Sequence, residues 1–307
     1  MENLDRSEER LENIQTVEPI IAALRTISLG GWRASLKRKR HVEQLLVDLT
    51  HMASALPLSV YSQSNSVQTS VTELTRSVLL VVGSERGLCG RFNSVIADRC
   101  EEYLNEQKQL GYDVELVAVG SRISHVLRRR GLELTATHSL SGAAVPAFDL
   151  CLDLSHQWLK RYETGDLQSG NMLYNRELGG ANYEPVITSI IPPSWPVVTH
   201  TMTDTSLSPP IIETDPLRLF AQIIEQSVVL RLYQVLLESR AVEHLARYQL
   251  TEAATQNIER LIDELKMANQ MEVRKKITRE MQELAVASGL LESSSGKKPS
   301  DAPVLRL

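Results

Sequence analysis

The hydrophobic pattern near the C-terminus predicts one very long helix. Between Pro216 and Gly289 there is no proline or glycine, the residues that cost about 3 and 1 kcal/mol in a helix interior. Apolar residues recur at the spacing of an amphipathic or coiled-coil helix: Leu217, Phe220, Ile224, Ile258, Leu261, Leu265, Ile277, Met281, Leu284 and Leu291. Such a helix would be on the order of 100 Å long, so it must pair with another helix, enter a partner, or both.

The N-terminal residues predict a second long helix. Its apolar stripes have the same spacing: Leu11, Ile14, Ile21, Leu24 and Ile27, then Val42, Leu45, Leu49 and Met52. Pro19 lacks a backbone donor and is expected to kink this helix, and Gly30 and Gly31 lower its stability. We expect the two helices to form an antiparallel coiled coil.

The middle of the chain has the pattern of an α/β domain. Val78–Val82 and Val114–Val119 are short apolar runs ended by glycine, which is typical of buried strands. Further strands are expected within 132–140, 171–177 and 186–191, and helices at 92–110, 121–130 and 148–163. This alternation predicts a Rossmann-like domain with a mainly parallel sheet, inserted between the two helical arms.

These patterns divide the chain into six parts. Ser, Thr, Gln and Asn enrich the first linker, prolines mark the second, and Ser, Gly, Lys and Pro enrich a tail that we expect to be disordered. The parts are an N-terminal coiled-coil helix (1–56), a linker (57–75), the α/β domain (76–195), a linker (196–214), a C-terminal coiled-coil helix (215–292) and the tail (293–307).

Composition narrows the function classes. The net charge of -5 over 307 residues does not suggest nucleic-acid binding. The three cysteines are widely spaced without a CxxC pattern, which argues against a disulfide framework or a zinc site. No apolar run approaches the roughly 20 residues that span a membrane, and the acidic start resembles neither a signal nor a transit peptide. We expect a soluble cytoplasmic protein.

The loop Gly83–Gly90 is the main candidate for chemistry, because a turn between a strand and a helix can cradle phosphate. Its spacing matches neither GxGxxG nor GK[ST], so we favour a tight turn that needs glycine. Cys89 could be activated near a helix N-terminus, but a small buried side chain is the favoured interpretation. The histidines have no metal-ligand spacing. We expect no catalytic residue, no cofactor and no metal.

Basic clusters lie on both predicted helices. One comprises Arg33 and Lys37–Arg40, and the other Arg274–Lys276 and Arg279. Such runs are commonly solvated helix faces, or they can steer a helix against an acidic partner surface. Both interpretations stay open.

Several segments carry a resemblance to the γ subunit of F-type ATP synthases. GSERGLCGRFN at residues 83–93 is similar to the family's RGLCGGFN, and Tyr174-Asn175 to its later YN. Matches without a gap follow along the C-terminal helix: Tyr233-Gln234, Glu238, Ala241, Glu243, Ala246-Arg247, Ala253-Ala254-Thr255, Asn257, Leu261-Ile262, Glu264-Leu265, Ile277-Thr278, Glu280 and Glu283. In the first helix the similar residues are Leu11, Gln15, Ile20 and Ala23-Leu24.

This resemblance implies a central-stalk rotor without an active site of its own. It would couple ion-driven rotation of a membrane ring to ATP synthesis or hydrolysis in a hexamer of α and β subunits. Its α/β domain, the foot, would contact the ε subunit and the c-subunit ring, peripheral to the cytoplasmic face of the membrane. The resemblance implies shaft contacts at Arg247, Thr278 and Glu283, and a bearing tip at Ala285–Leu291. It implies a structural foot loop that includes Gly87, Leu88, Cys89, Gly90 and Asn93.

The chain also departs from the family pattern. Pro19 stands within the family's NT.KIT segment, and Gly30-Gly31 replaces its SK. The altered first helix and the GSERG wording resemble divergent, alternative F-type ATPases, some of them proposed to move Na⁺. Two other functions stay open: a coiled-coil scaffold or adaptor that forms a homodimer, and a nucleotide-binding α/β enzyme with helical arms.

Overall fold

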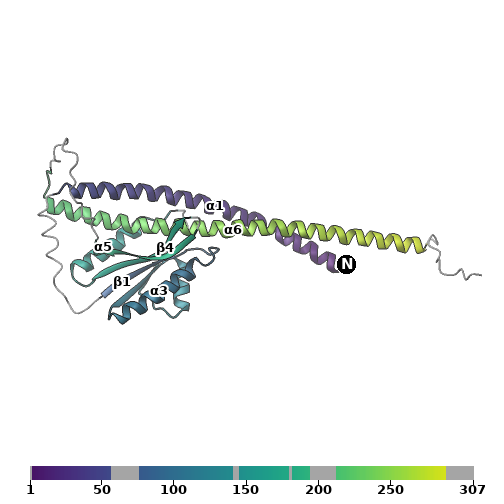
Figure 1. The fold of residues 1–307 in the computed structure, drawn as a ribbon, viewed down its shortest axis with the longest axis horizontal. Helices are drawn as coiled ribbons and strands as arrows, with labels where there is room; N and C mark the ends of the chain where they lie inside the picture. The colour runs from purple at the N-terminus through teal and green to yellow at the C-terminus, as the bar shows by residue number, and fades with distance from the viewer. Residues whose placement is uncertain (1, 57–75, 141–144, 180–181, 194–211, 288–307) are drawn as a thin grey trace, which may run out of the picture. The chain divides into compact units, whose positions relative to one another are not determined.

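The computed structural model describes residues 2–56, 76–140, 145–179, 182–193 and 212–287. The expected linkers 57–75 and 196–214 and the tail lie largely or wholly outside these residues. The elements in chain order (Figure 1) are α1 (Glu2–Ser54), β1 (Arg76–Val82), α3 (Phe92–Gln109), β2 (Asp113–Val119), α4 (Ser121–Arg129), β3 (Ala136–His138), α5 (Asp149–Glu163), β4 (Ser169–Gly179), β5 (Asn182–Ile191) and α6 (Pro216–Ala287).

Five strands form one sheet in the order β3-β2-β1-β4-β5. β1 pairs in parallel with β2 and β4, and β2 pairs in parallel with β3. Only β5 is antiparallel, because it returns directly from β4 as a hairpin. The mainly parallel, Rossmann-like sheet predicted from the sequence is therefore confirmed. The third strand is shorter than expected, since only 136–138 pair with β2.

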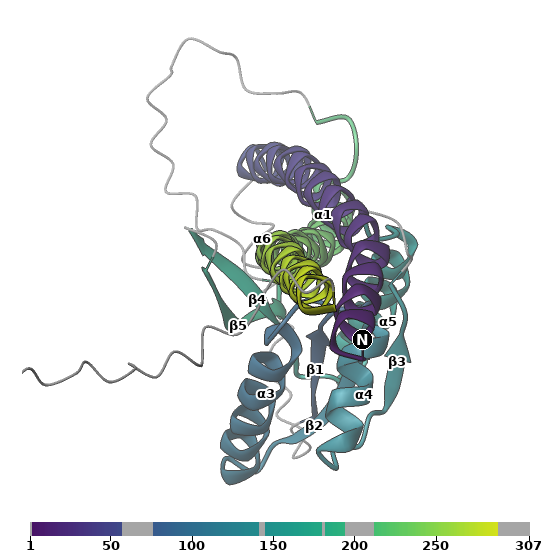
Figure 2. The same cartoon turned by 90° about the vertical axis from the view of Figure 1, so that its right-hand side faces the viewer.

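Alternating side chains of the strands belong to two hydrophobic cores, one on each face of the sheet. The ribbons of α3 and α6 lie on opposite sides of the sheet (Figure 2). Leu80 of β1 lies in the core that also holds Trp158 of α5 and Leu232 of α6. Leu79, its neighbour in sequence, lies in the opposite core with Ile96 of α3. The sheet is thus the middle layer of an α/β/α arrangement, and α6 contributes side chains to both cores.

The chain divides into two compact units. The larger unit comprises residues 22–253, and the smaller unit residues 1–21 and 254–307. The larger unit contains the whole α/β domain and the adjoining parts of α1 and α6. The six-part division expected from composition stays a prediction.

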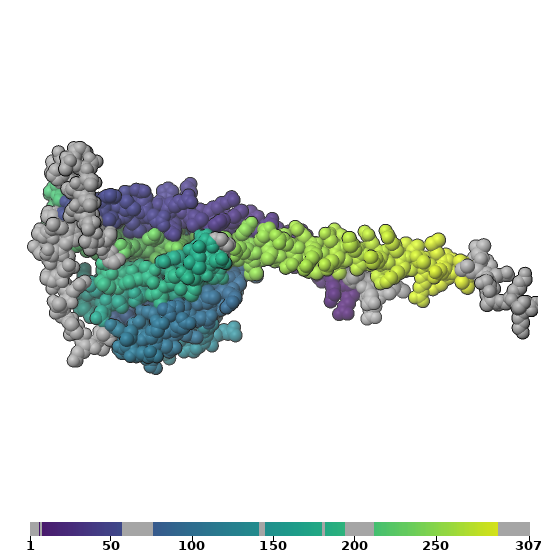
Figure 3. All heavy atoms as spheres, viewed as in Figure 1, coloured from purple at the N-terminus to yellow at the C-terminus, as the bar shows by residue number. Residues whose placement is uncertain are grey.

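Within the larger unit α1 and α6 run antiparallel. Arg25 forms an ion pair with Glu252 at 3.0 Å, and Lys39 forms one with Glu238 at 3.3 Å. The residue of α1 with the higher number pairs with the residue of α6 with the lower number, so the two helices run in opposite directions. In the space-filling view, α6 of this unit lies in contact with the α/β domain (Figure 3). The predicted antiparallel pairing is confirmed for this part of the chain.

The expected weak points of α1 do not interrupt it. The helix continues through Pro19 and through Gly30 and Gly31. A Cβ atom at Gly31 would lie 2.5 Å from ring atoms of His244 on α6, whereas one at Gly30 would have nothing within 4 Å. Gly31 therefore allows the two helices to approach closely. The kink expected at Pro19 stays a prediction.

Candidate functional site: the loop after β1 and its attachment to α6

The loop between β1 and α3 is a tight turn built on unusual backbone conformations. Leu88 and Gly90 have φ of 60° and 58°, the left-handed region that favours glycine. At Gly83, a Cβ atom would collide with Ile123 of α4. These constraints match the tight-turn interpretation of the sequence.

Asn93, at the start of α3, holds the loop by its side chain. Its Oδ1 accepts a hydrogen bond from the Ser84 N–H at 2.9 Å, and its Nδ2 donates to Ser84 Oγ at 2.7 Å. Cys89 is buried beside them, with Sγ 3.5 Å from Ser84 Oγ. Burial raises the pKa of the Cys89 thiol, which disfavours the reactive thiolate. The contacts are those of a structural turn.

Glu85 ties the same loop to the next two segments of the domain. Its carboxylate accepts hydrogen bonds from the Ser121 N–H at 3.0 Å, from the Ser121 hydroxyl, and from the Leu140 N–H at 2.9 Å. Burial alone would raise the pKa of Glu85, but the hydrogen bonds from Ser121 and Leu140 lower it overall. Ser121 begins α4, where the helix dipole also favours a negative charge.

A buried cluster of three charged residues lies on α6. Glu243 forms ion pairs with Arg240 at 2.6 Å and with Arg247 at 2.5 Å. The side chains of Arg240, Glu243 and Arg247 are 3%, 1% and 7% exposed. The ionised carboxylate of Glu243 is stable at this depth because both arginines compensate its charge. Removing one partner of a buried pair would leave an uncompensated charge.

Arg247 connects this cluster to the loop. Its guanidinium donates to the carbonyl oxygen of Gly87 at 3.1 Å and to that of Arg86 at 3.3 Å. Val242 and Ala246, on the same stretch of α6, belong to the hydrophobic core shared with α3 and α4. The loop and α6 are therefore joined by charge-assisted hydrogen bonds next to apolar packing.

Sequence reasoning selected Arg247 but not the cluster. A signal was present, because Arg240, Glu243 and Arg247 have the spacing of neighbours on a helix face. They also stand among apolar residues such as Val242 and Leu245. What the sequence did not contain was the direction in which that face points.

The other two predicted shaft contacts belong to the smaller unit. Thr278 is exposed and donates to the Arg274 carbonyl oxygen at 2.8 Å. Glu283 is exposed and pairs with Arg279 at 3.1 Å. The roles of Thr278, Glu283 and Arg247 as shaft contacts stay predictions. Of the predicted bearing tip, 285–287 are described and 288–291 lie outside the described residues.

The end of α6 carries exposed apolar side chains. No residue from Asp263 to Ala287 is buried. The large apolar side chains exposed in this stretch are Met267, Met271, Val273, Ile277, Met281, Leu284 and Val286. Isolated exposed apolar residues are ordinary in proteins, but a set that recurs along one helix marks an interaction surface.

The described residues contain neither a metal-binding cluster nor a membrane-spanning helix. No group of three or more His, Cys, Asp or Glu side chains is arranged to hold a metal ion in that part of the chain. None of the helices described has the length and apolar character needed to cross a membrane.

Comparisons with known proteins point to one family. A sequence model of the ATP synthase family (ATP-synt) matches residues 3–289. The ATP synthase gamma chain of Granulibacter bethesdensis is 26% identical, with 90% of this chain and 95% of that protein covered. The gamma chain of Pelotomaculum thermopropionicum is 22% identical, with 92% and 97% covered.

Solved structures have the same fold. A chain of the Euglena gracilis mitochondrial ATP synthase rotor, in rotational state 1, matches with a TM-score of 0.57 and 16% identity, covering 90% of this chain and 99% of that one. A chain from the OSCP/F1/c-ring structure of the same enzyme, in rotational state 3, matches with a TM-score of 0.59 and 15% identity, covering 98% and 99%.

Proposed function

Because the chain belongs to the ATP synthase family, as a gamma subunit of the central stalk, we propose that it is the rotor that couples ion-driven rotation of a membrane ring to ATP synthesis or hydrolysis. It contributes no active site of its own. Its part is mechanical, and the chemistry takes place in the α and β subunits that it contacts.

The observation that carries this proposal is the attachment of the α/β domain to α6. A rotor must transmit torque from its foot to its shaft without slipping. Here the buried cluster of Arg240, Glu243 and Arg247 binds the loop after β1, and α6 contributes side chains to both cores of the sheet. Close-packed cores transmit strain, because they leave little room to deform.

The exposed end of the same helix supports the second half of the proposal. α6 is one uninterrupted helix of 72 residues, and its large apolar side chains from Met267 to Val286 are exposed. A sleeve formed by α and β subunits would cover them. An asymmetric shaft in such a sleeve would favour a different β-subunit conformation at each angle, a population shift caused by differential contact.

The partners follow from this arrangement. We propose that the shaft contacts the α and β subunits, including contacts at Arg247, Thr278 and Glu283, and that the foot contacts the ε subunit and the c-subunit ring. The matched Euglena gracilis structures are titled as rotor and as OSCP/F1/c-ring of an ATP synthase, which supports a complex of this kind. The chain would then be peripheral to the cytoplasmic face of the cell membrane. Membership of a divergent subtype stays a prediction.

The loop after β1 supports a mechanical role over nucleotide binding. A phosphate cradle needs several backbone N–H groups directed at the ligand. In this loop the Ser84 N–H is donated to Asn93 and the Phe92 N–H to the Cys89 carbonyl oxygen. These two N–H groups stabilise the turn itself and are not directed at a ligand.

Stoichiometry tests the proposal. The full chain is mixed with α and β subunits and the products are weighed by native mass spectrometry. We expect one copy of this chain for each hexamer. A homodimer that ignores the α and β subunits would support the adaptor alternative. Tight, saturable binding of a nucleotide by the full chain alone would support the enzyme alternative.

A further inference from the structure

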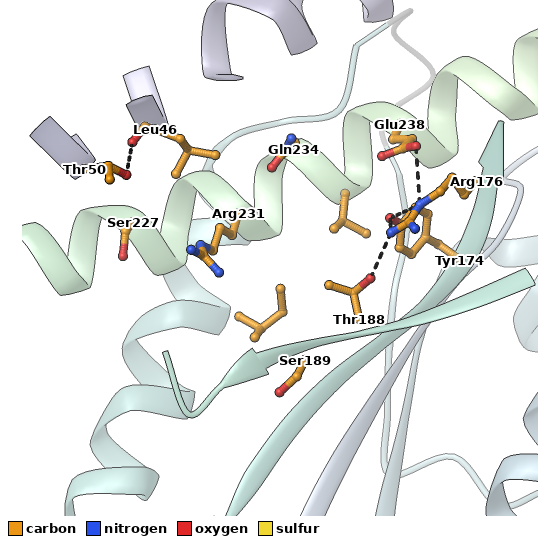
Figure 4. A pocket seen from close by; sticks show the side chains of 12 residues that line it. Leu46, Thr50, Tyr174, Arg176, Thr188, Ser189, Ser227, Arg231, Gln234 and Glu238 are labelled. Atoms are coloured by element: carbon orange, nitrogen blue, oxygen red, sulfur yellow. Dashed lines mark hydrogen bonds and ion pairs between the residues drawn. The ribbon is translucent and has the colours of Figure 1, made fainter. Parts of the chain in front are cut away.

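A cavity of about 250 Å³ lies in the larger unit between α6 and the β4–β5 hairpin. Leu46 and Thr50 of α1 line it at one side, and Figure 4 shows Arg231 of α6 and Thr188 of β5 on opposing sides of the space. Neither the turn after β1 nor the exposed end of α6 contributes to it. The proposed rotor function gives this cavity no role.

Hydrogen-bond donors reach the cavity from more than one element. Arg176 of β4 donates to Tyr174 Oη at 3.0 Å and to Thr188 Oγ1 at 3.4 Å. Each of these hydroxyls acts as an acceptor in that contact, so each keeps its proton for donation to another group. Arg231 supplies a second guanidinium from the opposite layer.

The charges of the lining residues favour an anion. Arg176 and Arg231 are cationic, and Glu238 is the one carboxylate among the described residues that line the cavity. Glu238 pairs with Lys39 of α1 at 3.3 Å, which is closer than its distance of 3.9 Å to Arg176. Burial lowers the pKa of Arg231 from its ordinary value, as expected for a cation removed from water.

From this arrangement we infer that the cavity is a binding site for the phosphate group of a small molecule. A tetrahedral phosphate accepts hydrogen bonds from several directions, and here guanidinium and hydroxyl donors come from α6, β4 and β5. The volume is below the roughly 300–1,000 Å³ of ordinary ligand pockets. The occupant is accordingly inorganic phosphate or a phosphate monoester of a few carbon atoms.

Binding at this position would fasten the hairpin to the helix pair. The cavity is lined by residues of α1, α6, β4 and β5, so one ligand bridges elements that are distant in the sequence. A ligand that binds only the folded form stabilises it. The expected consequence is a larger unit that resists unfolding better in phosphate than in chloride at equal ionic strength.

The test is a calorimetric titration of the full chain with inorganic phosphate and, separately, with glycerol phosphate. Arg231→Gln removes the half-buried cation, and Thr188→Val removes a hydroxyl donor while keeping the shape. Arg218→Gln, an exposed arginine of the same helix, is the matched control. We expect saturable binding by the unmodified chain and by Arg218→Gln, and at least about tenfold weaker binding by the two cavity variants.

The two titrants identify the source of the phosphate. Stronger binding of glycerol phosphate would assign the site to a phosphate monoester, and equal or weaker binding would assign it to inorganic phosphate. The inference is overturned if neither anion binds saturably. It is also overturned if Thr188→Val and Arg218→Gln bind the phosphate compounds with the same affinity. This comparison remains valid even if Arg231→Gln does not fold.

Discussion

Two stretches of α6 have the same helical pattern but opposite surroundings. Every residue from Ser227 to Arg247 is buried or half-buried, whereas no residue from Asp263 to Ala287 is buried. Both stretches carry charged residues at helical spacing. In the first, Glu243 is buried between two arginines; in the second, pairs such as Arg279 and Glu283 lie in solvent.

The first stretch is buried by other parts of this chain, whereas the second exposes apolar side chains that a partner protein could bury. The first stretch is covered by α1 and by the α/β domain, so even polar residues such as Ser239 and His244 are buried there. The second keeps a periodic apolar face with nothing in the described chain to cover it. The same helix is therefore a core element in one part and a binding surface in the other.

The largest expected effect comes from the buried charge. Glu243→Gln leaves the guanidinium groups of Arg240 and Arg247 buried with their shared carboxylate gone, and it should lower the free energy of unfolding of the larger unit by about 3–5 kcal/mol. Glu283→Gln removes a carboxylate from a solvent-exposed pair of the smaller unit and should change the free energy of unfolding of the chain by about 0.5 kcal/mol or less.

Denaturant titrations followed by tryptophan fluorescence measure both variants. If Glu243→Gln and Glu283→Gln lose the same free energy of unfolding, the buried cluster does not hold the loop to α6. A loss confined to Glu243→Gln sharpens the contrast between the two stretches.

Apolar truncation gives a second matched pair. Leu232 is completely buried and Leu284 is 69% exposed. Leu232→Ala should destabilise the larger unit by about 2–5 kcal/mol through lost transfer energy and a cavity. Leu284→Ala should stay within about 0.5 kcal/mol in the isolated chain, yet weaken assembly with α and β subunits. Thermal unfolding and a pull-down with those subunits measure the two effects. The account fails if Leu284→Ala impairs folding but leaves assembly unchanged.

The close approach of α1 and α6 predicts opposite results at two adjacent glycines. Gly31→Ala places a methyl group against the buried ring of His244 and should cost about 1–3 kcal/mol, as overpacking does. Gly30→Ala meets nothing within 4 Å and should stabilise the helix by about 0.5–1 kcal/mol. Midpoints in urea compare them. If both variants gain stability, the two helices are not in close contact at Gly31.

The smallest predicted effect depends on pH and on Glu85. Its folded-state pKa lies below the ordinary value of 4.5, so ionised Glu85 stabilises the fold above that ordinary pKa. The contribution disappears as pH falls through the lowered, folded-state pKa. Glu85→Gln should therefore reduce stability at pH 7 and lose its effect in stronger acid. Glu133→Gln, at an exposed glutamate of the same domain, is the control. A Glu85→Gln penalty that grows toward acid would contradict the assignment.

Much of the fold could be predicted from local signals. The absence of Gly and Pro after Pro216 defined α6, and runs such as Val78–Val82 defined the buried strands, because both patterns reflect properties of single elements. The segment 132–140 was overestimated because an edge strand is paired on one side only, and its length depends on the neighbour. The antiparallel direction of β5 likewise depends on the hairpin and not on its hydrophobic pattern.

The candidate site was less predictable, for a physical reason. A turn at Gly83–Gly90 could be predicted because local backbone geometry requires its glycines, whereas its place in a foot loop stays a prediction. The cluster of Arg240, Glu243 and Arg247 depends on which face of α6 meets the loop, a contact between residues about 160 positions apart. The cavity beside Arg231 also exists only after four elements have packed.

The central claim is tested most directly by watching the α/β domain turn. Cys89, Cys100 and Cys151 are buried, so a bead can be attached selectively through Lys108→Cys on the exposed face of α3. The complex with α and β subunits is fixed to a surface and observed under a microscope with ATP. The account predicts rotation of the bead in one direction while ATP is hydrolysed. Hydrolysis at a normal rate with a stationary or randomly fluctuating bead would contradict it.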